Sequence, residues 1–417
     1  MARRYSALAG AALLLFAAAC SPATEEASQP PPLIQLPEPL SADGDFGATL
    51  QAALIRAEPG EAIILPEGVF HLTEGLSLDV DGVTLRGAGQ GKTVLDFAGQ
   101  ESAGEGLMVT SDDVTLMDFA VRNTRGDAIK SKGADRITYK YLTVEWTGGP
   151  DETNGAYGIY PVESTDVLVE NVTVRGASDA GIYVGQSQNI IVRNSVVEYN
   201  VAGIEIENSM NADVYGNIAR YNTGGILVFD LPDLPVSGGH STRIYDNQIT
   251  ENNTRNFAPA GNIVASVPSG TGVIIMANRN VHVFDNTFDQ NRSAHVLVMS
   301  YSLPFTDEAY NPLPRDVVLR DNSYGEGGND PQGDLAPLAA ALGGSLPAIV
   351  WDGVDGWGEG AGQPINLAVK ESDEAGFLSL GLGRYPIDPA RMAPSPVRPA
   401  ATAAEEPARV VLPQDPA

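Results

Sequence analysis

Three segments between residues 158 and 224 repeat with almost no adjustment. Each begins with a glycine-led triplet, continues through short apolar runs and reaches an asparagine. The triplets are Gly158-Ile159-Tyr160, Gly181-Ile182-Tyr183 and Gly203-Ile204-Glu205, which recur after 23 and 22 residues. A fixed period of this length is typical of a solenoid, in which each repeat buries its core against its neighbours.

Within each repeat the apolar residues alternate with other residues. Ile182 and Val184 fall on one side of a strand, and Tyr183 and Gly185 fall on the other. This two-residue period indicates strands, and about three short strands per repeat describe one coil of a parallel β-helix. We therefore expect an all-β solenoid of about ten coils over residues 43–330. Its first strands start at Gly75, Gly106, Ala128, Gly158, Gly181, Gly203, Gly225, Gly272 and His295.

An asparagine recurs near the end of the second strand of most coils. Such a column predicts a stacked amide ladder, in which each side chain hydrogen-bonds to the next coil, so we interpret these residues as structural. They are Asn171, Asn194, Asn217, Asn247, Asn286 and Asn322.

The two ends of the solenoid need covers, because an open coil would expose its core and its strand edges. Residues 46–57 place Leu50, Ala53, Leu54 and Ala57 at helical spacing and predict a short capping helix. Residues 331–390 lose the repeat and predict an irregular C-terminal cap. The Pro- and Ala-rich residues 391–417 predict a disordered tail.

The N-terminus reads as an export signal over residues 1–19. Arg3 and Arg4 precede an apolar stretch from Leu8 to Phe16 and small residues that end at Cys20, the only cysteine. This site resembles a bacterial lipobox, which implies cleavage before Cys20 and a lipid on it. Residues 20–42 would then form a tether, and the protein would lie in the cell envelope, at the outer membrane or in the periplasm. The alternative is a plain signal peptide with an incidental cysteine.

The net charge of the chain makes some classes of binding partner unlikely. Twenty-five Lys and Arg against 53 Asp and Glu give a formal net charge of −28. Such a surface repels nucleic acid and anionic lipids, so neither is an expected partner, and membrane contact is expected only through the lipid. The scattered histidines show no metal-ligand spacing, and His282, between valines, is expected to face solvent.

The pattern Gly-Ile-x-Val…Asn-Ile-x-Val-x-Asn resembles the right-handed parallel β-helix proteins of the pectin-lyase-like superfamily, over roughly residues 46–325. More narrowly it resembles bacterial β-helix lipoproteins of unassigned function, which tend to be encoded beside a second exported protein. The superfamily includes polysaccharide lyases, epimerases, hydrolases, esterases and non-catalytic adhesins. The resemblance therefore implies the fold, and the function must be argued from a site.

One outward face of the predicted coils concentrates polar and aromatic side chains. Stacking of the first strands would align Lys130, Tyr160, Tyr183 and Glu205, with Lys132 and Glu207 in the column beside them. Four insertions border this face, at residues 145–157, 229–241, 250–271 and 300–315, and would form the rims of a groove. From these insertions four residues could reach a substrate: Trp146, Asp230, His240 and Arg255.

This groove allows several chemistries. A lyase or epimerase acting on uronate sugars needs a cation, a base and an acid, for which Lys130, Tyr160 and Tyr183 are candidates. An inverting hydrolase needs two carboxylates about 6.5–9.5 Å apart. Glu205 and Glu207, two apart on one strand, would lie at roughly 6–7 Å. A Ca²⁺ site could use the same carboxylates with Asp230. The plain alternative is that these are ordinary solvated residues.

The leading hypothesis is an exported, lipid-anchored β-helix protein that binds an extended, acidic polysaccharide and processes it by lyase- or epimerase-type chemistry. Its expected catalytic residues are Lys130, Tyr160, Tyr183, Glu205 and Glu207, and its expected substrate contacts are Lys132, Trp146, Asp230, His240 and Arg255. The alternative is a non-catalytic envelope protein that binds glycan or a co-exported partner protein. The apolar part of the face is expected to be core beneath the loops; it comprises Leu227, Phe229, Ile274 and Met276.

Overall fold

The structure, a computed structural model, describes residues 37–102, 104–357 and 365–415. The predicted signal peptide, Cys20 and most of the tether lie outside these residues. In the described part of the chain, no helix is long and apolar enough to cross a membrane.

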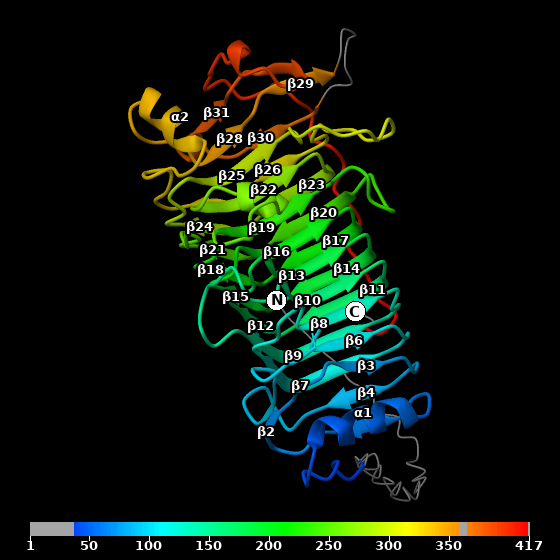
Figure 1. The fold of residues 1–417 in the computed structure, drawn as a ribbon. Helices are drawn as coiled ribbons and strands as arrows, with labels where there is room; N and C mark the ends of the chain where they lie inside the picture. The colour runs from blue at the N-terminus through cyan, green and yellow to red at the C-terminus, as the bar shows by residue number, and fades with distance from the viewer. Residues whose placement is uncertain (1–36, 103, 358–364, 416–417) are drawn as a thin grey trace, which may run out of the picture. The chain divides into compact units, whose positions relative to one another are not determined.

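The chain forms a parallel β-helix whose first strands make one continuous sheet, and the stacked ladders are visible in Figure 1. This first sheet has 11 strands. In spatial order they are β3 (Leu76–Leu78), β6 (Leu107–Val109), β8 (Ile129–Lys132), β10 (Tyr157–Val162), β13 (Ala180–Gly185), β16 (Ala202–Glu207), β19 (Gly224–Phe229), β22 (Thr271–Met276), β25 (Ala294–Met299), β28 (Ile349–Trp351) and β31 (Phe377–Ser379).

The remaining strands of the coils join into a second sheet of 19 strands, built from two parallel ladders. One ladder contains β1 (Ala62–Ile64), β4 (Thr84–Arg86), β7 (Thr115–Arg122), β9 (Thr138–Glu145), β11 (Thr165–Glu170), β14 (Gln188–Arg193), β17 (Met210–Tyr215), β20 (His240–Tyr245), β23 (Arg279–Phe284), β26 (Val318–Arg320) and β30 (Ala368–Lys370). The other contains β2 (Gly68–His71), β5 (Thr93–Asp96), β12 (Thr173–Arg175), β15 (Val196–Glu198), β18 (Ile218–Arg220), β21 (Gln248–Thr250), β24 (Thr287–Asp289) and β27 (Ser323–Tyr324). The long strands β7 and β9 pair in both ladders.

The predicted register of the first sheet is confirmed. Ile182 pairs with Ile159 on one side and with Ile204 on the other, and Ile204 pairs in turn with Ile226. These isoleucines are fully buried and belong to a core that runs through the coils. Because parallel strands in register place equivalent side chains about 4.8 Å apart, each coil extends the same apolar column.

The glycine that opens each triplet allows neighbouring backbones to approach. A Cβ atom added at Gly203 would lie 2.5 Å from the carbonyl oxygen of Gly225 in the next coil. Gly181 has the same constraint, because its Cβ would meet the side-chain nitrogen of Asn200 at 2.8 Å. The close stacking of neighbouring coils therefore requires the glycine of the Gly-Ile motif.

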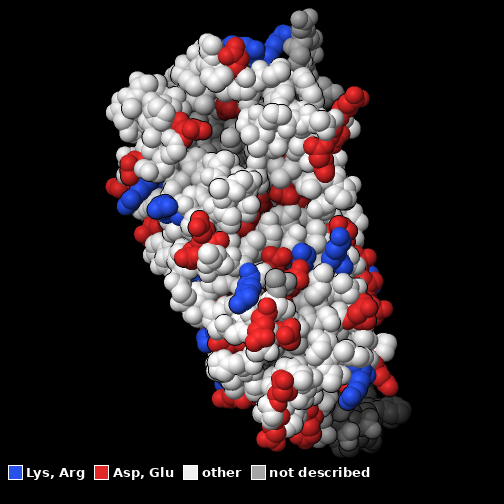
Figure 2. All heavy atoms as spheres, viewed as in Figure 1, with Lys and Arg blue, Asp and Glu red and all other residues white. Residues whose placement is uncertain are grey.

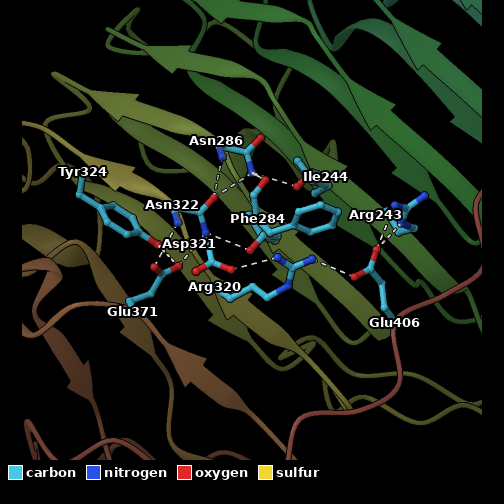
Figure 3. A network of polar contacts seen from close by, with 11 residues as sticks. Arg243, Ile244, Phe284, Asn286, Arg320, Asp321, Asn322, Tyr324, Glu371 and Glu406 are labelled. Atoms are coloured by element: carbon cyan, nitrogen blue, oxygen red, sulfur yellow. Dashed lines mark hydrogen bonds and ion pairs between the residues drawn. The ribbon is translucent and has the colours of Figure 1, made fainter. Parts of the chain in front are cut away.

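The asparagine ladder is confirmed in part. The Asn217 amide donates to Asn247 at 3.0 Å, and Asn247 donates to Asn286 at 2.9 Å. Figure 3 shows the end of this ladder, where Asn286 donates to Asn322 and Asn322 donates to the Glu371 carboxylate at 2.7 Å. The prediction is wrong for two of the six, because Asn171 and Asn194 adopt left-handed backbone conformations at turns, with φ of 53°.

A second amide ladder was not predicted. The Asn200 side chain donates to Asn222 at 3.0 Å, Asn222 donates to Asn252 at 3.0 Å, and Asn252 donates to Asn291 at 3.1 Å. These side chains are buried and also accept backbone N–H groups from neighbouring coils. They satisfy backbone groups that the tight turns leave without a partner in the strand ladders.

The N-terminal cap is the predicted helix. Helix α1 (Phe46–Arg56) begins after Asp45, whose side chain accepts the backbone N–H of Ala48 at 3.0 Å, as an N-cap residue does. Leu50 and Leu54 are fully buried against the first coil. The blue helix covers one end of the stacked coils in Figure 1.

The coils continue beyond residue 330, where the sequence predicts their end. β28, β30 and β31 extend the two sheets, because β28 pairs with β25, β30 with β26 and β31 with β28. Between and beyond them lie α2 (Leu335–Ala341), the paired strands β29 (Val354–Trp357) and β32 (Gly383–Tyr385), and the 3-10 turns η2 (Asp373–Ala375) and η3 (Pro389–Arg391). These last coils carry little of the Gly-Ile motif, so the repeat in the sequence did not predict them.

The C-terminal tail is held against the second sheet instead of being disordered. Residues 405–415, which we call the strap, run back along the coils, as the red trace beside β20 and β17 shows in Figure 1. Glu406 pairs with Arg243 at 2.9 Å and with Arg320 at 2.8 Å (Figure 3). Val410 and Leu412 pack on an apolar patch of the sheet. His282, expected to face solvent, is buried among these groups, because the strap covers it.

Candidate functional site

The outward face of the first sheet carries a group of buried carboxyl side chains. Glu205 and Glu207 project from β16, and Asp179 immediately precedes β13 in the neighbouring coil. We call these three residues the acid cluster. The register confirms the predicted column, since Lys130 pairs with Tyr160 and Tyr183 pairs with Glu205.

Glu205 is the most deeply buried member of the acid cluster. Its exposed fraction is 1%, and neither carboxyl oxygen has a hydrogen-bond partner among the described residues. Burial, followed by the charges of Asp179 and Glu207, raises the pKa of Glu205 well above its usual value. An ionised carboxylate without partners is very costly to bury, so we expect Glu205 to be protonated at pH 7.

Glu207 has one strong partner. The Tyr183 hydroxyl donates to its Oε1 at 2.6 Å. Burial raises the pKa of Glu207 to about 7, although this hydrogen bond acts in the opposite direction. The same carboxylate and the burial of the phenol raise the pKa of Tyr183, so Tyr183 stays protonated and serves as a donor. Glu207 is therefore balanced between its two protonation states near neutral pH.

Asp179 completes the acid cluster and was not predicted. Its Oδ2 accepts from the Tyr157 hydroxyl at 3.4 Å and from the Asn262 amide at 3.3 Å. Burial, and then the charge of Glu207, raises the pKa of Asp179 to about 7. The strand pattern could not predict a role for Asp179, because this residue lies in the turn before the strand. Only its position immediately before the Ala-Gly-Ile of β13 could have pointed to it.

Three tyrosine rings stand next to the carboxyls. The ring centres of Tyr157, Tyr160 and Tyr183 lie 4.5–4.9 Å apart and belong to two adjacent coils. Tyr157 and Tyr160 are half-buried, whereas Tyr183 is almost fully covered. Edge-to-face and tilted contacts at these distances stabilise such a group and fix its geometry.

Lys130 marks the more open end of the site. Its ammonium pairs with Glu105 at 3.3 Å and Asp127 at 3.4 Å, and it lies 4.6 Å from the centre of the Tyr160 ring. Burial alone would lower the pKa of Lys130, but Asp127, Tyr160 and Glu105 outweigh it and raise the pKa. The one ammonium of the site is thus already neutralised by two carboxylates.

Loops from both edges of the sheet cover the deep end of the site. From one edge comes the segment with η1 (Ile263–Ser266), whose Val264 and Val267 are buried over the sheet. From the other comes Tyr310, whose hydroxyl donates to the Asp230 backbone carbonyl at 2.6 Å. As predicted, the apolar column of Leu227 and Ile274 is core beneath these loops. Figure 2 shows a recess in the middle of the view with Asp and Glu atoms visible inside it.

With this geometry established, known proteins can be compared. A family profile described as "Right handed beta helix region" matches residues 81–237. The match covers less than half of the chain, and together with the sheets described above it shows the fold, a right-handed parallel β-helix. A search of curated protein sequences finds no match.

Solved structures with the same β-helix fold are numerous and distant. The A-module of mannuronan C-5 epimerase AlgE4 from Azotobacter vinelandii is 15% identical, with 79% of this chain and 91% of that chain covered and a TM-score of 0.51. The AlgE6 A-module from the same organism is 15% identical, with 78% and 92% covered and a TM-score of 0.49. A GH87 alpha-1,3-glucanase from Streptomyces thermodiastaticus is 18% identical, with 80% and 50% covered and a TM-score of 0.44. At 15% identity the likeness to the AlgE4 module shows the fold alone.

Four of the predicted substrate contacts of this β-helix protein lie apart from the acid cluster. Trp146 is buried in the solenoid core, where its indole N–H donates to the Thr124 carbonyl at 2.8 Å, so the groove prediction is wrong for it. His240 starts β20 of the second sheet and contacts Ser241. Lys132 is exposed and pairs with Glu163 at 3.3 Å.

Arg255 and Asp230 have different outcomes. Arg255 lines a separate cavity of about 170 Å³ with Asn253 and Arg292, so it does not approach the acid cluster. Asp230 is buried beside the acid cluster, where its charge raises the pKa of Glu207. Its carboxylate accepts the backbone N–H groups of Gly238 and Gly239, at 3.2 and 2.8 Å. It therefore anchors a rim loop.

The predicted Ca²⁺ site has no support from the geometry. Within residues 37–102, 104–357 and 365–415, no group of three or more His, Cys, Asp or Glu side chains is arranged to hold a metal ion. The acid cluster instead resembles a proton-transfer site, because its carboxyls have raised pKa values and a hydroxyl donor. An active site that uses one carboxyl group as an acid and another as a base needs environments that give the two groups different pKa values.

Proposed function

We propose that this β-helix protein binds an extended polysaccharide on the outward face of its first sheet and hydrolyses it by acid–base catalysis. The observation that carries the proposal is Glu205, a buried carboxyl with a raised pKa and no hydrogen-bond partner among the described residues, beside Glu207 with a pKa of about 7. A protein gains no stability from such an arrangement, and perturbed carboxyls gather at functional sites.

In this proposal Glu205 is the general acid and Glu207 the general base. The Glu205 proton moves to the glycosidic oxygen as the bond between this oxygen and the anomeric carbon breaks. Glu207 takes a proton from the water whose oxygen bonds to that carbon. Tyr183 is a positioning residue, because its hydroxyl holds Glu207 at 2.6 Å.

Lyase or epimerase chemistry on a uronate is the second candidate. Tyr183 and Lys130 lie at either side of Tyr160, as that chemistry would need. However, the Lys130 ammonium is already shared by Glu105 and Asp127, and burial raises the pKa of Tyr183 so that it is a poor base. A uronate carboxylate would also meet the acid cluster without a free cation. The site therefore favours a neutral sugar at the reacting position.

The test is a turnover assay of the purified chain on a panel of neutral and uronate polysaccharides. Hydrolysis releases reducing ends without ultraviolet absorbance, whereas elimination produces an absorbing unsaturated end. We expect reducing ends only, and a loss of about 10²–10⁴-fold in rate for Glu205→Gln.

The matched control is Glu74→Gln, the same change at an exposed residue just before β3 of the same sheet. It should leave turnover unchanged. Full activity in Glu205→Gln would refute the assigned role. Binding of a glycan without any product, in the native chain, would favour the non-catalytic envelope protein.

Export and the lipid on Cys20 are proposals supported by the N-terminal sequence. Radiolabelled palmitate should enter the chain in cells and fail to enter the Cys20→Ala variant, in which the modified residue is absent. Labelling of both variants would contradict the anchor.

A further inference from the structure

The rim of the first sheet beyond Asp230 carries a column of nitrogen-bearing side chains. His240 starts β20, Arg279 starts β23, and Arg315 lies in the next coil. His240 is the register partner of Arg279, and Arg279 bridges to Arg315 through a parallel backbone pairing. Partners in a parallel ladder place their side chains on the same face, so the two guanidinium groups are neighbours.

These arginines have no anionic partner in the described parts of the chain. The other arginines in the strands of the second sheet pair with carboxylates, as Arg175, Arg193 and Arg320 do. Arg315 is half-buried and its Nε has no hydrogen-bond partner among the described residues, whereas Arg279 is exposed.

The charges of Asp230 and Asp316 act to raise the pKa of Arg315, but Asp230 accepts backbone N–H groups and Asp316 accepts from the Asn366 amide. Burial, and then the charge of Arg279, outweighs them and lowers the pKa of Arg315. Like charges side by side destabilise a sheet. In a chain of net charge −28, two adjacent arginines without an ion pair among the described residues point to an anionic ligand.

A polar cavity adjoins this column. Its volume is about 470 Å³, and Met210, the register partner of His240, lies in its wall. The polar part of the lining comprises Glu163, Ser164, Thr165, Gln186, Ser187 and Gln188, and the apolar part comprises Met210, Pro235 and Val236. Hydroxyl and amide groups of this kind hydrogen-bond to sugar hydroxyls. The cavity and the arginine pair are thus consecutive parts of the same rim.

We propose that Arg279 and Arg315 form a binding site for an oxyanion carried by a glycan, either a carboxylate, a sulfate or a phosphate. Paired guanidinium groups hold such groups through two parallel N–H donors each. The ligand chain would lie along the rim, with sugar hydroxyls in the polar cavity and the anion at the arginine pair. The site stands without the proposed hydrolysis, because binding requires no turnover.

The test measures binding to the full chain by calorimetry, using anionic and neutral oligosaccharides of equal length. The native chain should bind the anionic one about tenfold or more tightly, and Arg279→Gln/Arg315→Gln should bind both equally. Arg292→Gln, at an exposed arginine on another edge, is the matched control and should keep the preference.

A second measurement separates a glycan-borne anion from a free one. A few millimolar sulfate or inorganic phosphate, at constant ionic strength, should raise the Tm of the native chain and not that of the double variant. An equal preference in the double variant, or no preference in the native chain, overturns the proposal. Stabilisation by free anions without any binding of anionic glycan shows an adventitious ion only and also overturns it.

Discussion

Glu198 and Glu205 are both buried glutamates, on consecutive strands that belong to different sheets, and they differ in their partners. Glu198, on β15 of the second sheet, pairs with Arg175 at 2.6 Å and with Arg220 at 2.9 Å. These arginines outweigh the effect of burial and lower the pKa of Glu198. Glu205, on β16 of the first sheet, has no hydrogen-bond partner within the described part of the chain, and burial raises its pKa.

The register explains this difference. Arg175 and Arg220 pair directly with Glu198 in the coils on either side. The residues that flank Glu205 in the same way are Tyr183 and Leu227, which carry no positive charge. The second sheet thus supplies arginine partners for a buried glutamate whose role is structural. The first sheet supplies no such partners for the buried glutamate on the face that we assign to catalysis.

The largest expected effect is on stability, from removing the paired glutamate. Glu198→Ala removes the carboxylate that Arg175 and Arg220 share, and it leaves Arg175 with only the longer contact to Glu145 at 3.9 Å. It should reduce the free energy of unfolding by about 2–3 kcal/mol. Glu205→Gln replaces a neutral carboxyl with a neutral amide and should change it by less than about 1 kcal/mol. Urea unfolding at pH 7 measures both, with Glu74→Gln as the control. A loss for Glu205→Gln as large as that for Glu198→Ala would contradict the comparison.

The pH dependence of stability should have opposite signs in the two regions. Asp179 and Glu207 have folded pKa values of about 7, so the native state binds more protons than the unfolded state between the ordinary values and pH 7. Stability should fall as the pH rises through this window, by up to about 1.4 kcal/mol per unit for each group.

Glu198 behaves in reverse, because its folded pKa is lowered. Its contribution is present above the unfolded pKa and disappears as the pH falls through the folded value. Unfolding curves at several pH values should therefore show a slope above pH 5 that Glu207→Gln reduces and Glu198→Gln leaves intact. An unchanged slope in Glu207→Gln would show that the acid cluster titrates normally.

The smallest expected effect is in the strap. Glu406→Gln removes the carboxylate shared by Arg243 and Arg320 and should cost about 0.5–1 kcal/mol, since these groups are partly exposed. Hydrogen exchange should become faster in residues 405–415 while the amides of β20 and β26 stay protected. Faster exchange throughout those coils would instead show that the strap stabilises the solenoid itself.

Much of the fold could be predicted from the sequence, because stacking repeats one local rule. The Gly-Ile triplets fixed the register of the first sheet, so Lys130, Tyr160, Tyr183 and Glu205 were brought together correctly. Elements without this repeat were missed. The coils after residue 330 carry different residues at the same positions, and the Pro- and Ala-rich strap is ordered only by contacts with distant strands.

The rest of the site depends on loops, whose paths the coil period does not determine. Asp179 lies in a turn, and its contact with Asn262 joins segments far apart in sequence. Trp146 was expected to reach the groove from an insertion, but its large apolar ring is buried in the core. Glu205 is also almost completely buried in the folded chain, so the sequence could place this residue on the face without predicting its raised pKa.

The most direct test is a carboxyl NMR titration of the full chain labelled with ¹³C at the glutamate side chains, with Glu205 and Glu198 assigned through their Gln variants. We predict that the Glu205 signal stays that of a protonated acid through pH 7, while Glu198 is ionised from about pH 5 upward. Ionisation of Glu205 near its ordinary value of about 4.3 would contradict the account.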